Sequence, residues 1–167
     1  MIKKEKVEIA AENLFGCESR GYFICGKQIK CIMEKIEIPQ GSEACDVEAR
    51  RRIISQFYHD WKMRNPTLRR YNLSLKEYIN IRFVSITETC THAARNYYST
   101  LAVLQLDAIL TNAKRVATVR AKANGNQKPF DKMIVMKYEC IGEVKMTVGV
   151  RRRTHEKVQY CITALEV

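Results

Sequence analysis

Residues 147–165, TVGVRRRTHEKVQYCITAL, alternate between apolar and polar side chains on both sides of a basic turn. A period of two is typical of β-strands with one face on a core, so the stretch predicts a β-hairpin. The tip of this hairpin holds Arg151, Arg152, Arg153, His155 and Lys157. Two interpretations are open: a working site on nucleic acid, or a charged hairpin end that keeps a sheet edge soluble.

The same period of two appears upstream of the hairpin. Residues 114–122 alternate, 124–132 are rich in turn formers, and 133–140 predict a further strand. We therefore expect a C-terminal antiparallel sheet of three to four strands. Alternation places one set of side chains on the helix layer, namely Val144, Met146, Val148, Val150, Val158, Tyr160, Ile162 and Ala164.

The opposite face of this sheet is predicted to be polar and basic. It carries Lys145, Thr147, Gly149, Arg151, Gln159, Cys161 and Thr163. On the strand at 114–122, Arg120 and Lys122 share a face with Val116, while Arg115 lies on the other. Arg offers forked donors to phosphate, and Thr and Gln suit sugar and base edges, but the same residues also occur on ordinary solvated faces.

Helical signals fill the middle of the chain. Ser42 predicts the start of a helix that carries Val47, Ile53 or Ile54, Phe57 and Trp61 on one stripe and ends before Pro66. The S-x-x-E pattern at 74–77 predicts a short helix over 75–83. Residues 85–113 predict a long helix, buried in its second half and ending at Asn112.

These elements define an α+β fold in two parts. Residues 1–40 are predicted to form an N-terminal β or extended addition, with a β segment over 22–38. Residues 41–167 form the main domain, with helices over 42–113 and the antiparallel sheet over 114–167.

The charge of the chain points to a polyanionic partner. Lys and Arg number 29 against 18 Asp and Glu, which gives a net charge of +11 and a pI near 9.4. Nucleic acid is the first candidate, ahead of an anionic membrane surface or an acidic protein, although many proteins are this basic for solubility alone. Residues 112–167 alone carry twelve basic and five acidic groups.

Cysteine usage and hydropathy favour a cytoplasmic protein. The seven cysteines show no C-x2-C spacing, so we expect free thiols and neither a metal nor another cofactor. The N-terminus has no apolar segment typical of a signal peptide. The longest apolar run, LAVLQLDAIL, is too short to cross a bilayer, so no membrane association is expected.

Three histidines are candidates for acid–base chemistry. His155, beside arginines, has the best context; His92 lies in the polar stretch TETCTHAAR, and His59 is a surface or core residue. A histidine of this kind can act as general acid or base when a ribose 2′-hydroxyl attacks the adjacent phosphodiester. Arg151 or Arg153 would stabilise the negative charge that develops on phosphorus.

The C-terminal part, with VKMTVGVRRRTHEKVQYCITAL at 144–165 as its closing hairpin, resembles the RelE/barnase/EndoU-like nuclease superfamily. Toxins and mobile-element polyvalent proteins are the most similar versions. The resemblance covers about residues 85–167 and implies a metal-independent ribonuclease with a basic or histidine-bearing sheet face. It assigns the basic catalytic positions to Arg120, Lys145, Arg151 and His155, and a hydroxyl position to Thr163. The sheet lacks the second histidine of an EndoU-type pair.

We therefore expect a nucleic-acid-binding protein, with RNA favoured, that acts through the basic face of the C-terminal sheet. In its sharper form it is a metal-independent endoribonuclease with catalytic residues His155, Arg151 and Lys145. The expected nucleic-acid contacts are Arg120, Lys122, Thr147, Arg153, Gln159, Thr163 and His92. The alternative is a non-catalytic basic module that binds an acidic protein partner or nucleic acid.

Overall fold

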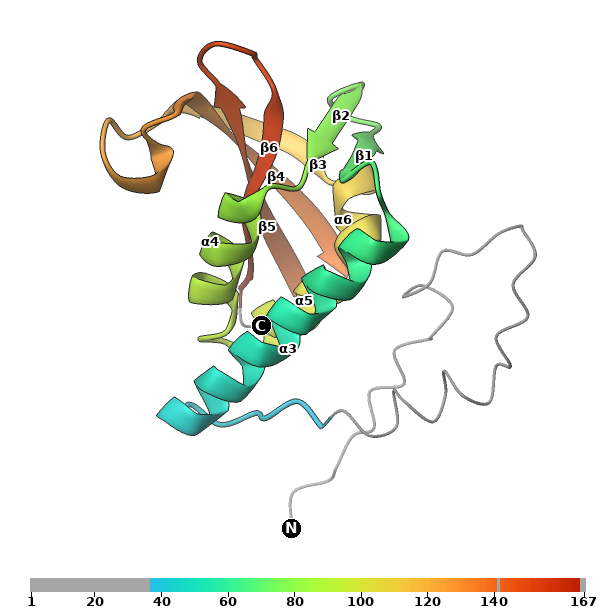
Figure 1. Ribbon diagram of the computed structural model, residues 1–167, viewed down its shortest axis with the longest axis vertical. Helices are drawn as coiled ribbons and strands as arrows, with labels where there is room; N and C mark the ends of the chain where they lie inside the picture. The colour runs from blue at the N-terminus through green and yellow to red at the C-terminus, as the bar shows by residue number, and fades with distance from the viewer. Residues whose placement is uncertain (1–36, 141, 166–167) are drawn as a thin grey trace, which may run out of the picture. The chain divides into compact units, whose positions relative to one another are not determined.

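The computed structural model describes residues 37–140 and 142–165, which belong almost entirely to the unit Ile38–Val167 (Figure 1). The N-terminal β segment expected over 22–38 lies outside the described residues, except for its last two positions. Within the described part the fold is α+β, as predicted: four α-helices and a six-stranded sheet.

The first described helix is α3, Ala44–Arg64. It begins two residues later than predicted from Ser42, because Glu43 is its N-cap and the Glu43 amide donates to Asp46 Oδ2 at 3.3 Å. It ends before Pro66, as predicted. Its buried stripe consists of Arg50, Ile54, Tyr58 and Trp61, with Val47 and Phe57 packed at its margin.

The predicted helix over 75–83 is wrong, because these residues contain the end of a turn and strand β2 (Glu77–Asn80), which forms a hairpin with strand β1 (Arg69–Asn72). Asn72 accounts for the difference: its side chain accepts from the Leu75 amide at 2.8 Å and donates to carbonyls at the end of α6, Leu106–Asn112. Ser74, the expected helix cap, instead accepts from the Arg115 amide at 3.1 Å. Tertiary partners have overridden the local capping signal.

The long helix predicted over 85–113 is three helices, α4 (Phe83–Ala93), α5 (Tyr97–Val103) and α6. Asn96 makes the first break, because its side chain caps α5 by accepting from the Ser99 amide at 2.8 Å. The predictions of a buried second half and of an end at Asn112 are confirmed, since Leu106, Ile109 and Leu110 are fully buried.

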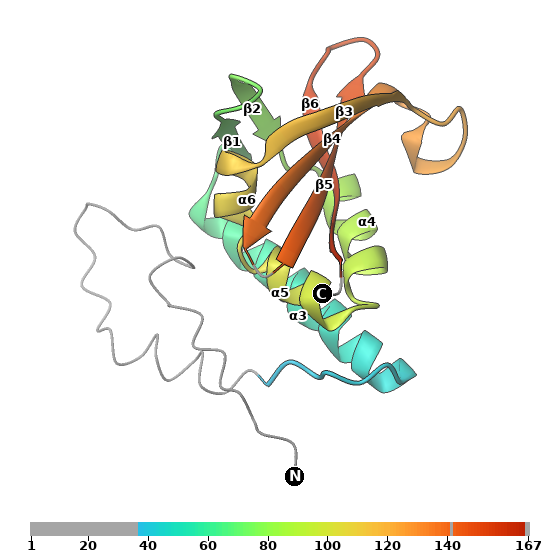
Figure 2. The same ribbon diagram turned by 180° about the vertical axis from the view of Figure 1, so that it is seen from behind.

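The remaining strands are β3 (Lys114–Arg120), β4 (Phe130–Cys140), β5 (Gly142–Arg151) and β6 (Lys157–Ala164). The sheet order is β1-β2-β6-β5-β4-β3. The predicted antiparallel sheet of three to four strands is therefore too small and is not purely antiparallel, because β2 joins it in parallel with β6. The sheet is strongly curled, so β3 arches across its far end (Figure 2). A 3-10 turn, η1 (Gly125–Gln127), lies between β3 and β4.

The core fills the concave face of the sheet. Strand side chains such as Met136, Met146, Val148 and Ile162 pack there against α3, α5 and α6. Because β2 pairs with only the first two residues of β6, the rest of that edge is covered by α4 (Figure 1). None of the helices in the described residues is long and apolar enough to cross a membrane.

A β-bulge in β6 changes which side chains face the core. Thr147 pairs with Cys161 but Val148 pairs with Gln159, so Tyr160 is the extra residue. Beyond the bulge, Val158 and Tyr160 turn to the convex face, where they pack with Phe130 and Met133. The prediction that Val158 and Tyr160 face the helices, with Gln159 on the open face, is therefore wrong.

Candidate functional site

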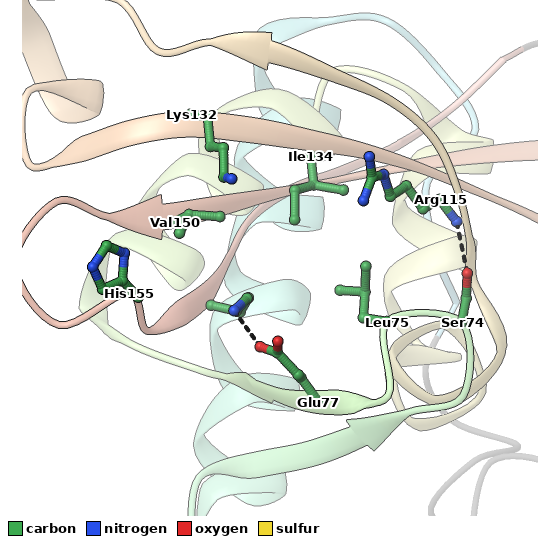
Figure 3. Close-up of a pocket in the computed structure, with 9 residues that line it drawn as sticks. Ser74, Leu75, Glu77, Arg115, Lys132, Ile134, Val150 and His155 are labelled. Carbon is green, nitrogen blue, oxygen red and sulfur yellow. Dashed lines mark hydrogen bonds and ion pairs between the residues drawn. The ribbon is translucent and has the colours of Figure 1, made fainter.

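An open pocket of about 380 Å³ lies on the concave face, at the end of the sheet that the helices leave uncovered (Figure 3). The turn between β1 and β2 forms one wall, and β3, β4 and β6 with the β5–β6 turn form the others. The pocket is lined by Ser74, Leu75, Glu77, Arg115, Lys132, Ile134, Val150, His155 and Lys157.

Strand register brings the cations of the pocket together. Lys132 on β4 lies opposite Val150 on β5, and Val150 lies opposite Lys157 on β6, so these side chains form one row across the sheet. Arg120 on β3 lies opposite Lys132 and extends the row at the rim. Like charges placed directly opposite each other on a sheet, as Arg120 and Lys132 are, lower the stability of the fold. A bound anion would offset this repulsion, so the row is a candidate anion site.

Arg115 joins this face because β3 also contains a bulge. Arg115 pairs with Met136 and Ala117 with Val135, which leaves Val116 as the extra residue. Strict alternation had separated Arg115 from Arg120, but the bulge returns both to the concave face. The Ser74 hydroxyl holds the Arg115 backbone, and the guanidinium points into the pocket (Figure 3).

Among the described residues that line the pocket, Glu77 is the one with an acidic side chain, and it forms an ion pair with Lys157 (Figure 3). Among residues 37–140 and 142–165, neither Arg115 nor Lys132 has an ion-pair partner. The described pocket therefore combines two uncompensated cations with a third that is shared with a carboxylate.

His155 lies at the mouth of the pocket in a left-handed backbone conformation, with φ of 56°. This conformation is uncommon for a residue other than glycine, and it is held here by a hydrogen bond of 3.0 Å from the His155 amide to the Arg151 carbonyl. The side chain is exposed, so its imidazole is open to solvent beside the lysines. The turn thus positions a titratable group at the pocket.

The three residues predicted to be catalytic do not converge. Only His155 lines the pocket. The Nε atom of Arg151 lies 3.2 Å from Glu156 Oε2, an ion pair whose geometry does not form a hydrogen bond. Glu156 also forms an ion pair with Arg82. Lys145 lies on the convex face opposite Thr163, six residues and therefore about 20 Å along β5 from Arg151.

The predicted nucleic-acid contacts are also divided. Arg120 lies at the pocket rim, and Arg153 is exposed in the neighbouring β5–β6 turn. Lys122 is exposed in the loop after β3, while Thr147 and Thr163 lie half-buried on the convex face. Gln159 is a correction, because it is fully buried and cannot contact a ligand.

Gln159 serves the core instead. It accepts a hydrogen bond of 2.8 Å from the Tyr58 hydroxyl and donates one of 3.0 Å to Thr89 Oγ1. Burial, opposed in part by the hydrogen bond with Thr89, raises the pKa of the Tyr58 hydroxyl well above its usual range. The three side chains satisfy one another where strand β6 meets α3 and α4.

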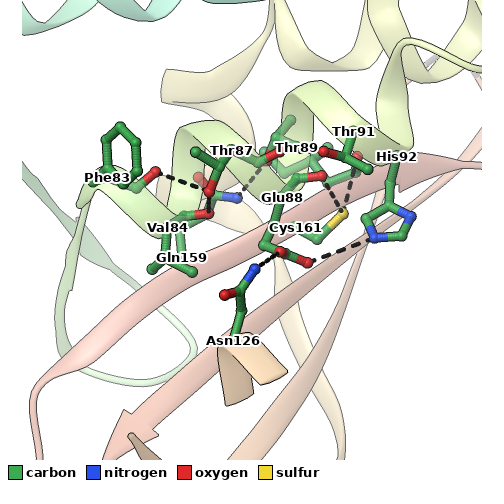
Figure 4. A network of polar contacts seen from close by, with 11 residues as sticks. Phe83, Val84, Thr87, Glu88, Thr89, Thr91, His92, Asn126, Gln159 and Cys161 are labelled. Atoms are coloured by element: carbon green, nitrogen blue, oxygen red, sulfur yellow. Dashed lines mark hydrogen bonds and ion pairs between the residues drawn. The ribbon is translucent and has the colours of Figure 1, made fainter. Parts of the chain in front are cut away.

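His92 belongs to a second polar network, on the convex side of β6 (Figure 4). Its Nε2 lies 3.5 Å from Glu88 Oε2, and Glu88 also accepts from Asn126 Nδ2 at 2.5 Å. Burial and then Glu88 raise the pKa of the Cys161 thiol to about 12, although Lys145 opposes the shift. Burial and a hydrogen bond to Glu88 likewise raise the pKa of Tyr160 to about 12.

This network attaches the loop around η1 to the body of the protein and offers no activated nucleophile, because Cys161 is protonated at neutral pH. Within the described residues, no three His, Cys, Asp or Glu side chains are grouped as metal ligands. The pocket on the concave face is therefore the stronger candidate for chemistry.

Sequence reasoning missed Glu77, Arg115, Lys132 and Lys157. The sequence pattern predicts Lys132 in a loop, and Glu77 in a helix that does not form. The bulges in β3 and β6 and the return of the β1–β2 turn onto β3 bring these residues together, and none of the three has a local sequence signal.

The fold and the pocket define an α+β protein with a curled mixed sheet and an open basic pocket on its concave face. No protein-family model, no curated protein and no solved structure matches the chain.

Proposed function

We propose that the protein binds nucleic acid, with RNA favoured, through the basic pocket and its rim. The observation that carries the proposal is the row of Arg120, Lys132 and Lys157 across four strands. Arg115 lines the same pocket, and Glu77 is the one acid in the part of the lining that the structure describes. Backbone phosphates are the ligands that such a row suits, because they would neutralise Arg115 and Lys132, which have no ion-pair partner among the described residues, and would share Lys157 with Glu77.

RNA binding is tested by fluorescence anisotropy with a labelled single-stranded RNA over a range of salt concentrations. Lys132→Ala and Arg115→Ala should each weaken binding by about tenfold, since each removes a charge-assisted hydrogen bond to phosphate. Each should also reduce the slope of log affinity against log salt by about 0.7, the loss of one phosphate contact on a single strand.

The matched control is Lys62→Ala, which removes the same charge from an exposed position on α3. Equal effects of Lys62→Ala and Lys132→Ala on RNA affinity would show that binding depends on net charge alone and not on the pocket. Absence of any affinity for RNA at low salt would refute the proposal and would favour an acidic protein as partner.

Cleavage of the bound RNA is a second candidate function, supported by Glu77 and His155 in the same pocket. Glu77 would take the proton from a 2′-hydroxyl, whose oxygen attacks the adjacent phosphorus. His155 in its protonated form would give a proton to the departing 5′-oxygen, leaving a 2′,3′-cyclic phosphate. Arg115 and Lys132 would stabilise the additional negative charge on the phosphorane.

This activity predicts cleavage in the presence of EDTA, with 2′,3′-cyclic phosphate ends detected by mass spectrometry. Glu77→Gln and His155→Ala should each lower the cleavage rate by about a hundredfold or more, which is the usual contribution of a general acid or base. His92→Ala is the control and should leave the rate unchanged. If the native protein leaves the RNA uncleaved, the cleavage proposal is wrong and the binding proposal stands.

A further inference from the structure

The convex face of the β1–β2 hairpin exposes two neighbouring aromatic rings. Tyr71 lies opposite Tyr78, their ring centroids are 5.4 Å apart, and the rings meet edge to face at 76°. They are 44% and 49% exposed although they lie side by side. The Arg69 guanidinium lies over the Tyr78 ring, 4.4 Å from its centroid.

The charges around these rings suit an anionic ligand. Residues 66–82 contain four basic groups and one acid, Glu77, whose side chain lies in the pocket on the other face. Arg70 pairs with Asp107 and Arg82 with Glu156. Arg69 and Lys76 have no ion-pair partner among the described residues.

The hairpin also connects this face to the pocket. Leu75 and Glu77 line the pocket, while Tyr71 and Tyr78 project from the opposite face of the same two strands. Lys76 lies between them in the turn, exposed and in a left-handed conformation with φ of 56°. A chain that leaves the pocket over this turn passes Lys76 before it reaches the rings.

We propose that Arg69, Tyr71 and Tyr78 form a stacking site for an unpaired base of the RNA strand whose phosphates lie in the basic pocket. This inference rests on the proposed function. Tyrosine rings beside an arginine stack on any base through its π-face, so the site is tolerant of sequence. It selects single strands, because the bases of a duplex are already stacked on each other.

The test compares the affinity of the protein for two labelled strands of ten nucleotide units with the same number of phosphates. One strand is RNA, and the other is an abasic ribose phosphate chain. The native protein should bind the RNA strand about tenfold or more tightly than the abasic strand. The double variant Tyr71→Ala/Tyr78→Ala should lose this preference and still bind the abasic strand like the native protein. Tyr71→Phe/Tyr78→Phe keeps the rings and should keep the preference.

Thermal melting followed by circular dichroism shows whether each variant folds, and the comparison of the two strands on the native protein tests the stacking site even if the alanine pair does not fold. Equal binding of the RNA and abasic strands by the native protein would overturn the stacking site. In that case, weaker binding of RNA by Lys132→Ala would show that the pocket binds RNA without a stacking site. A preference for RNA that survives Tyr71→Ala/Tyr78→Ala would also overturn it. Failure of both strands to bind would refute the proposed function and this inference together.

Discussion

At the scale of single residues, Arg50 is the most unusual side chain in the core. It is fully buried on α3, and it has no carboxylate partner among the described residues. Its guanidinium donates 2.7 Å hydrogen bonds to the carbonyls of Pro39, Gly41 and Ala94. One side chain thus joins the segment before α3 to the end of α4, using the forked donors that arginine alone provides.

Arg50→Met should lower the free energy of unfolding by about 1–3 kcal/mol, because the Ala94 carbonyl then loses its donor in a buried site and the part-buried carbonyls of Pro39 and Gly41 lose theirs. Arg50→Lys should recover only part of this loss, since a single ammonium cannot replace the planar fork. Urea denaturation measures both changes. Arg52→Met is the control: its side chain is 80% exposed, and it should change stability by less than about 0.5 kcal/mol. A similar small effect of Arg50→Met would contradict the role assigned to this residue.

At the scale of elements, the parts of the fold predictable from sequence are those with a strong local period. The closing strands and α3 follow such patterns, and their ends at Ala164 and Arg64 lie close to those predicted. The β1–β2 hairpin was not predictable, because its turn depends on hydrogen bonds from Asn72 to α6 and from Arg115 to Ser74, which are distant in sequence.

The same reasoning explains why the candidate site was only partly predictable. His155 and Arg120 were found because they lie in strongly basic strand ends. The positions of Arg115 and Lys157 in the pocket depend on two bulges, because each bulge reverses the face on which the residues beyond it lie. In β6, this reversal moved Gln159 from a predicted contact surface into the core, and it left Lys157 on the concave face with Lys132.

At the scale of the whole molecule, the curled sheet brings distant segments together around one basic hollow. The β1–β2 turn, from one edge of the sheet, meets β3 at the other edge through the hydrogen bond between Ser74 and the Arg115 backbone. The hollow is thereby bounded on both sides, and cations from β3, β4 and β6 face it. A flat sheet with the same sequence would hold these cations in a line without a pocket.

This arrangement stores electrostatic repulsion that counterions should relieve. Arg120 lies opposite Lys132, and Lys114, Lys137 and Lys145 lie opposite one another across three strands, in a chain with a net charge of +11. Raising NaCl from about 20 mM to about 300 mM shortens the Debye length severalfold, and we expect the melting temperature to rise by a few degrees. Differential scanning calorimetry measures this shift. Lys132→Gln removes one repulsive pair and should reduce the salt-induced rise in melting temperature. A melting temperature that falls with salt would contradict the prediction, because it would mean that the ion pairs of Glu77, Glu143 and Glu156 outweigh the repulsion.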